Sequence, residues 1–146
     1  MQVRIADPAA ALRASSLRVT KQRLAVVGAL RRAPHSDLDS VRDAVRADIG
    51  SISTQAIYDL LAALVRAGLV RRLALGGWPV RFELCEPNHH HVACRSCGAV
   101  ADVEAVPTLR PARGHGYRID QTEVTHWGSC PSCRSAGAPP HQEEGR

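Results

Sequence analysis

Two Cys-x-x-Cys pairs constrain the fold of this chain more than any other feature of its sequence. Cys94 and Cys97 form the first pair, and Cys130 and Cys133 form the second. Each pair can place two thiolates on one ion from a tight turn, and Gly98 suits such a turn. Together the pairs supply a closed tetrahedral shell of four sulfurs. Such a shell is typical of a structural zinc site and leaves no open position for catalysis.

Redox-active dithiols and accidental spacing are the alternatives to a zinc site. The first residues do not form a basic and then apolar signal, so we expect a cytoplasmic protein, in which such pairs more often hold metal than form disulfides. Aromatic residues make up only 3% of the chain, and a small domain with so few needs a staple such as a metal ion. Cys85 is left over, and we expect it to be a half-buried strand residue rather than a ligand.

Positive charge is concentrated in the first part of the chain, whose formal net charge is +5 overall. Residues 1–86 contain 13 Lys and Arg against 8 Asp and Glu, whereas residues 87–146 contain 6 of each kind. A basic segment joined to a neutral, cysteine-rich one favours a polyanion reader attached to a sensor. A slightly Arg-rich protein without a nucleic-acid partner is the alternative. No run of about 18 apolar residues is present, so we expect no membrane partner.

Apolar residues at helical spacing predict four helices in the first half of the chain. Thr20 and Ser53 are the expected N-caps of the second and fourth helices, and either Ser36 or Asp37 caps the third. Gly68 is the expected stop of the fourth helix. The helices cover residues 8–14, 21–33, 36–47 and 53–67, and their core-facing positions are Leu24, Val27, Leu30, Leu38, Val41, Val45, Ile57, Leu60, Leu61 and Leu64.

After the fourth helix the apolar period changes to two. Residues 69–75 and 79–84 predict a β-hairpin around a Gly76–Gly77 turn. Helices followed by a hairpin is the element order of a winged helix-turn-helix, and the basic charge favours DNA as its partner. A generic small α+β domain has the same order and is the alternative. The expected core-facing residues of the second hairpin strand are Val80, Phe82 and Leu84.

Short strands follow a linker at residues 86–88, which gives an α+β fold with two domains. We expect a winged helix-turn-helix DNA-binding domain at residues 1–85 and a small α/β domain at residues 89–136. Proline and glycine residues in 104–116 keep any helix there short. Residues 137–146 have the composition of a disordered tail. The predicted strands of the second domain cover residues 90–94, 99–103, 117–120 and 123–128.

Three consecutive histidines precede the first cysteine pair. On a strand, His89 and His91 share a face and His90 points away. Further nitrogen and oxygen ligands that the fold can bring to the same place are His35, Glu83 and Asp102. Three imidazoles and two carboxylates suit Fe(II), Mn(II), Ni(II) or Zn(II). The spacing alone does not distinguish this site from a polar, solvated loop.

Several segments of the chain resemble the ferric uptake regulator family. They are "LRVTKQRLAVV", "SISTQAIYDLLAALVRAGLVRR", "RFEL", "NHHHVACRSCGAVADV" and "EVTHWGSCPSC", in matching order and spacing over residues 10–134 or so. The sequence most resembles the actinobacterial branch associated with catalase genes, and then the peroxide-sensing repressors. The resemblance implies a transcriptional repressor, not an enzyme, that responds to iron or peroxide. It also implies a homodimer that binds double-stranded operator DNA, with Zn2+ on the four cysteines of a dimerisation and metal-sensing domain.

The same resemblance implies a regulatory metal with five ligands, namely His35, Glu83, His89, His91 and Asp102. Fe2+ or Mn2+ is the implied ion, with Zn2+ or Ni2+ as alternatives. Zinc-uptake regulators of the family usually have Cys where Glu83 stands, which argues against that branch. In the peroxide-sensing branch a histidine ligand is oxidised, and His35 and His91 are the candidates here. Candidates for a further metal site, each of which is otherwise a solvated surface residue, are His90, Glu104, His115 and His126.

DNA-contact residues are also implied by the resemblance. The recognition helix is "STQAIYDLLAALVRA", and Tyr58 resembles a family tyrosine that contacts thymine methyl groups. The alternative for Tyr58 is an aromatic packed on its own domain. Asp59 stands where many members have Arg, which is a departure from the family pattern. The candidate DNA-contact residues are Thr20, Lys21, Arg23, Ser53, Thr54, Gln55 and Tyr58.

Two functions of other classes account for parts of the sequence. A metallo-hydrolase needs an open coordination position and a nearby base, and no residue has a clear role as that base. A zinc-ribbon scaffold leaves His35, Glu83 and Asp102 without a joint purpose. Specific DNA binding that appears only with added divalent metal distinguishes the repressor from both.

Overall fold

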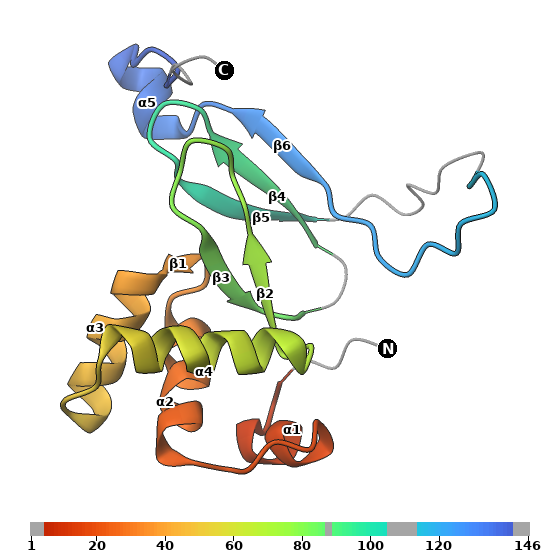
Figure 1. The fold of residues 1–146 in the computed structure, drawn as a ribbon. Coiled ribbons are helices and arrows are strands. Elements are labelled where there is room, and N and C mark those ends of the chain that lie inside the picture. Colours follow the sequence, from red (N-terminus) through yellow and green to blue (C-terminus); the bar gives the residue numbers. More distant parts are fainter. Residues whose placement is uncertain (1–4, 87–88, 105–113, 142–146) are drawn as a thin grey trace. The chain divides into compact units, whose positions relative to one another are not determined.

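The computed structural model describes residues 5–86, 89–104 and 114–141 and divides into two compact units, residues 1–87 and 88–146 (Figure 1). Within the described residues, the first unit contains four helices and a three-stranded sheet, and the second contains a three-stranded sheet and one short helix. This is the α+β class that the sequence predicts. None of the described helices is long and apolar enough to cross a membrane. Most of the predicted linker, residues 87–88, lies outside the described residues.

The helices of the first unit begin where the sequence provides capping side chains. Thr20 and Ser53 each accept the backbone N–H three residues further on, at 3.2 and 3.0 Å. Asp37 rather than Ser36 caps the third helix. Gly68, with φ of +73°, ends the fourth helix as predicted, because a left-handed residue costs glycine no steric clash. The helices are α1 (Pro8–Ala14), α2 (Lys21–Arg32), α3 (Leu38–Ile49) and α4 (Thr54–Arg66).

A three-stranded antiparallel sheet in the first unit contains the predicted hairpin. The hairpin strands are β2 (Val70–Leu73) and β3 (Arg81–Leu84), and β3 also pairs with a short strand β1 (Ser36–Asp37). The connection between β2 and β3 is longer than the predicted Gly76–Gly77 turn. Pro79 has no N–H to donate to the ladder, so pairing starts only at residue 81. The sequence does not reveal β1, because two residues are too few to show a period.

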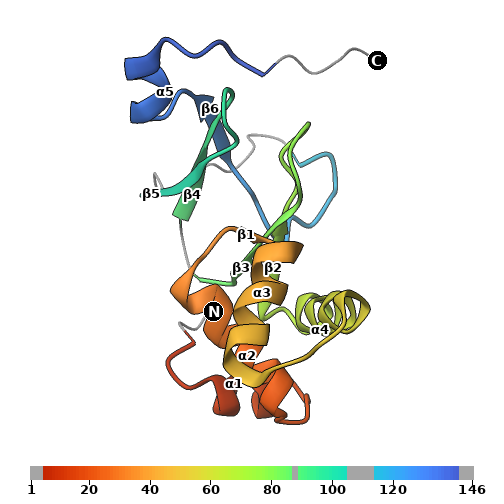
Figure 2. The same cartoon turned by 90° about the vertical axis from the view of Figure 1, so that its left-hand side faces the viewer.

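One apolar core holds the helices of the first unit to its sheet. Because the buried residues of α4 form one stripe, its opposite face is turned to solvent (Figure 2 shows this helix nearly end-on). Burial of each Leu, Ile or Val contributes about 1.5–3 kcal/mol of transfer free energy. Of the predicted core-facing helix positions, Leu24, Leu38 and Leu60 pack against the core while partly exposed, and Val27, Leu30, Val41, Val45, Ile57, Leu61 and Leu64 are fully buried.

The second unit is built on a three-stranded sheet with the order β5-β4-β6. The central strand β4 (His89–Cys94) is antiparallel to β5 (Val100–Glu104) and parallel to β6 (Thr125–Gly128). A short helix, α5 (Pro131–Ala136), follows β6 and has Cys130 as its N-cap. Strand β4 therefore has histidines at its beginning and the first cysteine ligand at its end.

Residues 117–120, predicted as a strand, do not form one. In the part of the chain that the structure describes, they pair with none of the three strands of this sheet. The Tyr117 and Ile119 side chains are exposed, and Arg118 forms an ion pair with Asp120 at 2.9 Å. A period of two shows which side chains share a face, but it does not supply the neighbour that a strand requires.

The segment after α5 makes hydrogen bonds within its own unit. Residues 137–141, expected to begin a disordered tail, are hydrogen-bonded to the two cysteine loops. The Ala138 N–H donates to the Cys133 carbonyl at 3.0 Å, and the Ser96 hydroxyl donates to the Ala138 carbonyl at 3.2 Å. Gly137, with φ of +62°, reverses the chain so that these bonds form. The rest of the predicted tail, residues 142–146, and the stretch 105–113, in which a short helix was considered, lie outside the described residues.

Candidate metal centres and DNA-contact surface

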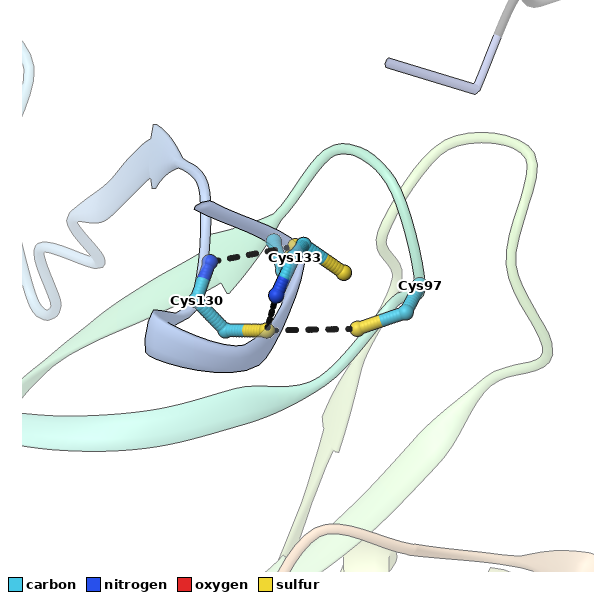
Figure 3. Close-up of side chains that lie close together, drawn as sticks. Cys97, Cys130 and Cys133 are labelled. Carbon is cyan, nitrogen blue, oxygen red and sulfur yellow. Dashed lines mark hydrogen bonds between the residues drawn. The ribbon is translucent and has the colours of Figure 1, made fainter. Parts of the chain in front are cut away.

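Two tight turns bring the four cysteines of the second unit together. Cys94 ends β4, and Gly98, with φ of +71°, closes the loop that carries Cys97. Cys130 caps α5, and Cys133 lies in its first turn. Figure 3 shows Cys97 and Cys130 turned toward each other from these two loops.

The spacing of the four sulfurs fits a tetrahedral ion. All four Sγ atoms lie within 4.8 Å of one another, and those of Cys97 and Cys130 are 3.7 Å apart. Zinc–sulfur bonds of about 2.3 Å in a tetrahedron place two sulfurs about 3.8 Å apart. Two backbone N–H groups also point at sulfurs, that of Cys130 at Cys94 and that of Cys133 at Cys130. This geometry is consistent with the predicted zinc site.

The pKa values of two of the clustered thiols shift in opposite directions. The hydrogen bond from the Cys130 N–H lowers the pKa of Cys94 to about 6. A hydrogen bond with the Cys130 sulfur raises the pKa of Cys133 to about 12. The first thiolate therefore forms readily, whereas the last is opposed by the sulfurs around it. A divalent cation removes that opposition because it neutralises the thiolates.

The first unit pairs His35 with Glu83. His35 Nε2 lies 3.0 Å from Glu83 Oε2, and both side chains are largely buried. The pairing of Ser36 with Phe82 in β1 and β3 sets this position, because continuing the antiparallel register places His35 opposite Glu83. His35 has φ of +61°, which is rare for a residue with a side chain and turns it out of α2 toward the sheet. Two ligands at right angles on an ion, each about 2.1 Å from it, are about 3.0 Å apart.

Arg71 is a further member of this cluster that the sequence analysis missed. It lies on β2 directly opposite Glu83 and donates from Nε to Glu83 Oε1 at 2.7 Å, with a second bond from Nη2 to the same oxygen. Opposite charges in directly paired positions of the predicted hairpin were the available signal. The glutamate of β3 is thus placed between a histidine that immediately precedes β1 and an arginine of β2.

The second unit holds the other predicted ligands of the regulatory site. His89 and His91 lie on one face of β4, and both approach Asp102 of β5, with Nε2–Oδ1 distances of 3.6 and 3.5 Å. His91 and Asp102 are partners in the β4–β5 register, and His91 is only 4% exposed. Alternation along the strand thus places the first and third histidines together, as the sequence predicts. Two imidazoles and a carboxylate at these distances can share one ion.

The candidates for a further metal site are only partly brought together. His90, on the other face of β4, has Nδ1 3.4 Å from His126 Nε2 on β6. Glu104 is the register partner of His89 rather than of His90. His115 lies in an exposed turn with φ of +47°. Of the four candidate ligands, the structure therefore brings only His90 and His126 together.

The candidate DNA-contact residues lie at the starts of α2 and α4. Tyr58 is 55% exposed, so its side chain is not packed into the core of its own unit. Gln55 donates to Asp59 at 2.9 Å, which engages the amide with the residue that departs from the family pattern. Thr54 Oγ1 accepts from Arg42 at 3.3 Å, and Arg23 donates to the Arg18 carbonyl at 2.7 Å. The remaining candidates are the two capping residues Thr20 and Ser53 and the exposed Lys21.

Comparison with known proteins places the chain in one family. The model of the ferric uptake regulator family matches residues 14–125. The transcriptional regulator FurA of Mycobacterium tuberculosis is 43% identical over 134 residues, which cover 88% of this chain and 91% of that protein. The peroxide-responsive repressor PerR of Staphylococcus aureus is 30% identical over 131 residues, with 86% and 88% covered.

Solved structures show the same fold. The ferric uptake regulator Fur of Helicobacter pylori superposes with a TM-score of 0.70 at 20% identity, covering 86% of this chain and 87% of that one. The regulator of Pseudomonas aeruginosa with manganese gives 0.66 at 22% identity, with 85% and 98% covered. The relatives are named as regulators of transcription, and the chain is accordingly a regulator and not an enzyme. The sequence, the fold and the paired cysteines agree that this chain belongs to the ferric uptake regulator family.

Proposed function

We propose that this protein is a metal-dependent repressor that binds operator DNA as a homodimer when a regulatory ion is held by ligands from both of its units. The observation that carries the proposal is the division of the ligand set. His35 and Glu83 belong to the unit with the recognition helix, and His91 and Asp102 belong to the unit with the cysteine cluster. Within each unit the ligands already approach one another at 3.0–3.6 Å.

The chemistry of these ligands suits Fe2+ or Mn2+ as the regulatory ion. The five predicted ligands are imidazoles and carboxylates, which suit iron, manganese, nickel and zinc, and none is a thiolate, which favours softer ions. The ferric uptake regulator from Pseudomonas aeruginosa was solved with manganese, and that from Francisella tularensis was solved with iron. Zn2+ or Ni2+ is the alternative, and a zinc-bound manganese uptake regulator has the same fold.

In this proposal, an ion shared by ligands of both units couples metal binding to DNA binding. His35 immediately precedes β1, and Glu83 lies in the hairpin strand β3. Both residues therefore belong to the same compact unit as α4. When they share an ion with His89, His91 and Asp102, the first unit is held at one angle. We propose that this angle lets the two α4 helices of a dimer enter successive major grooves.

The four-cysteine cluster has a structural role in this proposal. Its closed shell of sulfurs fits Zn2+ and leaves no position for a substrate. The dimer is supported by apolar side chains that the second unit exposes at Tyr117, Ile119 and Trp127. Exposed apolar groups of this size favour association with another surface, here a second copy of the chain.

The exposed face of α4 supports DNA as the partner. Tyr58 and Gln55 lie near its N-terminal end, where a recognition helix contacts base edges. Residues 1–86 contain 13 basic and 8 acidic side chains. This net positive charge attracts the segment to phosphates. With operator DNA as its partner, the protein acts in the cytoplasm.

The proposal is tested by titrating the zinc-loaded protein, stripped of its regulatory metal, with Fe(II), Mn(II), Zn(II) and Ni(II) in the presence of operator DNA. We expect specific binding to be absent without added metal and to appear with Fe(II) or Mn(II). His91→Ala should abolish the response, whereas His115→Ala should leave it unchanged. Specific binding that is indifferent to metal would refute the proposal, and a response to Zn(II) or Ni(II) alone would establish the alternative.

A further inference from the structure

Arg71 holds one oxygen of a carboxylate whose other oxygen faces a histidine. Two of its hydrogen bonds go to Glu83 Oε1, and Glu83 Oε2 lies 3.0 Å from His35 Nε2. The Glu83 side chain is 3% exposed and that of Arg71 is 13% exposed. The pair sits in adjacent positions of β2 and β3, so its geometry is fixed by the register of the sheet.

We infer that Arg71 is a positioning residue for the regulatory metal, which fixes Glu83 so that Oε2 is presented to the ion. This inference rests on the proposed function. A guanidinium is a rigid planar donor, so two of its N–H groups fix the place of Oε1 and leave the other oxygen, Oε2, facing His35. Partners that orient a ligating carboxylate in this way commonly change metal affinity 10–100-fold when they are removed.

The charge of Arg71 has two opposing effects on an ion at this site. It holds the buried carboxylate by hydrogen bonds to Oε1, but it would also repel a cation held by Oε2. The hydrogen bonds act at contact distance, whereas the carboxylate would separate the two cations and weaken their repulsion. Loss of Arg71 should therefore weaken metal binding rather than strengthen it.

His35 is positioned by other contacts, which separates its role from that of Arg71. Arg81 donates from Nη1 to the His35 carbonyl at 3.4 Å, and the pairing of Ser36 with Phe82 fixes the adjoining backbone. Substitution of Arg71 leaves these contacts in place. Its effect on metal binding should thus be exerted through Glu83.

The test measures the dissociation constant for Mn(II) on the zinc-loaded full-length protein, by competition with a chelating dye. We expect Arg71→Met to weaken Mn(II) binding 10–100-fold. Arg71→Lys should be intermediate, because an ammonium keeps the charge but not the planar fork. Arg72→Met is the matched control, since it removes the same charge from the next, exposed position of β2 and should bind Mn(II) as the wild type does. At saturating Mn(II), Arg71→Met should recover the operator affinity of the wild type.

Two comparisons keep the outcomes distinguishable. If Glu83→Ala binds Mn(II) as tightly as the wild type, the ligand set of the proposed function is wrong. If Glu83→Ala loses Mn(II) but Arg71→Met retains wild-type affinity, Arg71 is only a packing residue and the inference is overturned. Should Arg71→Met fail to fold, Arg71→Lys decides: a loss of about threefold or more supports positioning, and unchanged affinity overturns it.

Discussion

At the scale of single residues, hydrogen bonds divide polar side chains between structure and recognition. Thr20 and Ser53 accept backbone N–H groups as N-caps, a role that contributes about 1 kcal/mol each. Their hydroxyl protons can still be donated to a phosphate, because accepting a bond does not consume the O–H. Tyr58 has no such structural task in the core, since more than half of its side chain is exposed. It is therefore the residue whose loss should most purely affect base recognition.

We expect Tyr58→Ala to relax operator preference while stability is kept. Loss of an apolar contact with a thymine methyl group should reduce discrimination by about 1–3 kcal/mol at that base pair. Truncation of an exposed side chain should change the free energy of unfolding by no more than about 0.5 kcal/mol. Fluorescence anisotropy with operator variants and unrelated DNA measures the first effect, and chemical denaturation measures the second.

Lys21→Ala provides the contrasting result for this prediction. A lysine that neutralises one phosphate should weaken binding equally on all sequences and reduce the slope of log K against log salt by roughly one unit per chain. If Tyr58→Ala keeps the operator preference of the wild type, the tyrosine does not read bases. Gln121→Ala, which shortens an exposed side chain of the second unit, should change neither the operator preference nor the slope.

At the scale of elements, α5 is held at its beginning by a residue with two roles. Cys130 caps the helix through its sulfur and belongs to the four-cysteine cluster. Serine is a good N-cap but a poor zinc ligand, so Cys130→Ser separates these roles. A helix of six residues does not persist in water on its cap alone. Its stability must therefore come from tertiary contacts, which include the cysteine cluster and the hydrogen bonds of Ala138.

Cys130→Ser should remove one zinc per chain and, with it, the folded second unit and the dimer. A structural zinc contributes folding free energy directly, about 10–16 kcal/mol in small zinc peptides. Elemental analysis gives the zinc content, and light scattering after size exclusion gives the mass. Cys85→Ser, outside the cluster, should keep both. A Cys130→Ser protein that remains dimeric and folded would show that the cluster is not a structural staple.

Elements with a local cause could be predicted from sequence, and those that depend on a distant partner could not. The starts of α2 and α4 follow from their capping residues, and Gly68 marks the end of α4. The strand predicted at 117–120 has the correct period but no neighbour in the described sheet. The two-residue β1 exists only because β3 is beside it.

The candidate sites show the same division. The two cysteines of each Cys-x-x-Cys pair are close in sequence, so the cysteine cluster could be predicted. Alternation on one strand likewise groups His89 with His91. His35 and Asp102 could be named as possible ligands from their residue types, but only the family resemblance joins them to those histidines, because no short-range pattern connects them. Arg71 was missed because its role depends on the strand register, which sets Glu83 opposite it.

At the scale of the whole molecule, the proposed regulatory site makes metal binding and DNA binding one coupled equilibrium. In the proposed function, ligands from both units would bind an ion together only in the arrangement that binds DNA, so each event would favour the other. Linkage requires the two effects to be equal. If saturating Mn(II) raises operator affinity by some factor, saturating operator DNA must raise Mn(II) affinity by the same factor.

This reciprocity can be measured directly. We expect a factor between about 5 and 150, the range of typical coupling free energies. Dye competition gives the Mn(II) dissociation constant with and without operator DNA, and anisotropy gives the DNA constant with and without Mn(II). Unrelated DNA of the same length is the control. Operator DNA that leaves Mn(II) affinity unchanged, while Mn(II) raises DNA affinity, would show that the metal acts elsewhere than at the proposed site.

Two signals can release the repressor from DNA, namely peroxide and iron scarcity. Iron held by imidazoles and carboxylates can react with peroxide, and the histidines that hold it are the nearest oxidisable groups. His91 is 4% exposed and His35 is nearly as buried, so a reagent formed in the bulk solvent reaches them poorly. Oxidation of these two residues should therefore require iron at the site. Under simple iron sensing, by contrast, the ion dissociates when iron is scarce and the histidines stay intact.

Peptide mass spectrometry after peroxide treatment separates these two signals. We expect one added oxygen on His35 or His91 in the Fe(II) form, together with loss of operator binding, and no such change in the Mn(II) form. His126, an exposed histidine outside the proposed ligand set, serves as the internal control for oxidation from solvent. Equal oxidation of His126 and His91 would mean that the attack is not local. Intact histidines with DNA binding retained would identify iron availability as the signal, because the protein would then lack any chemical record of the peroxide.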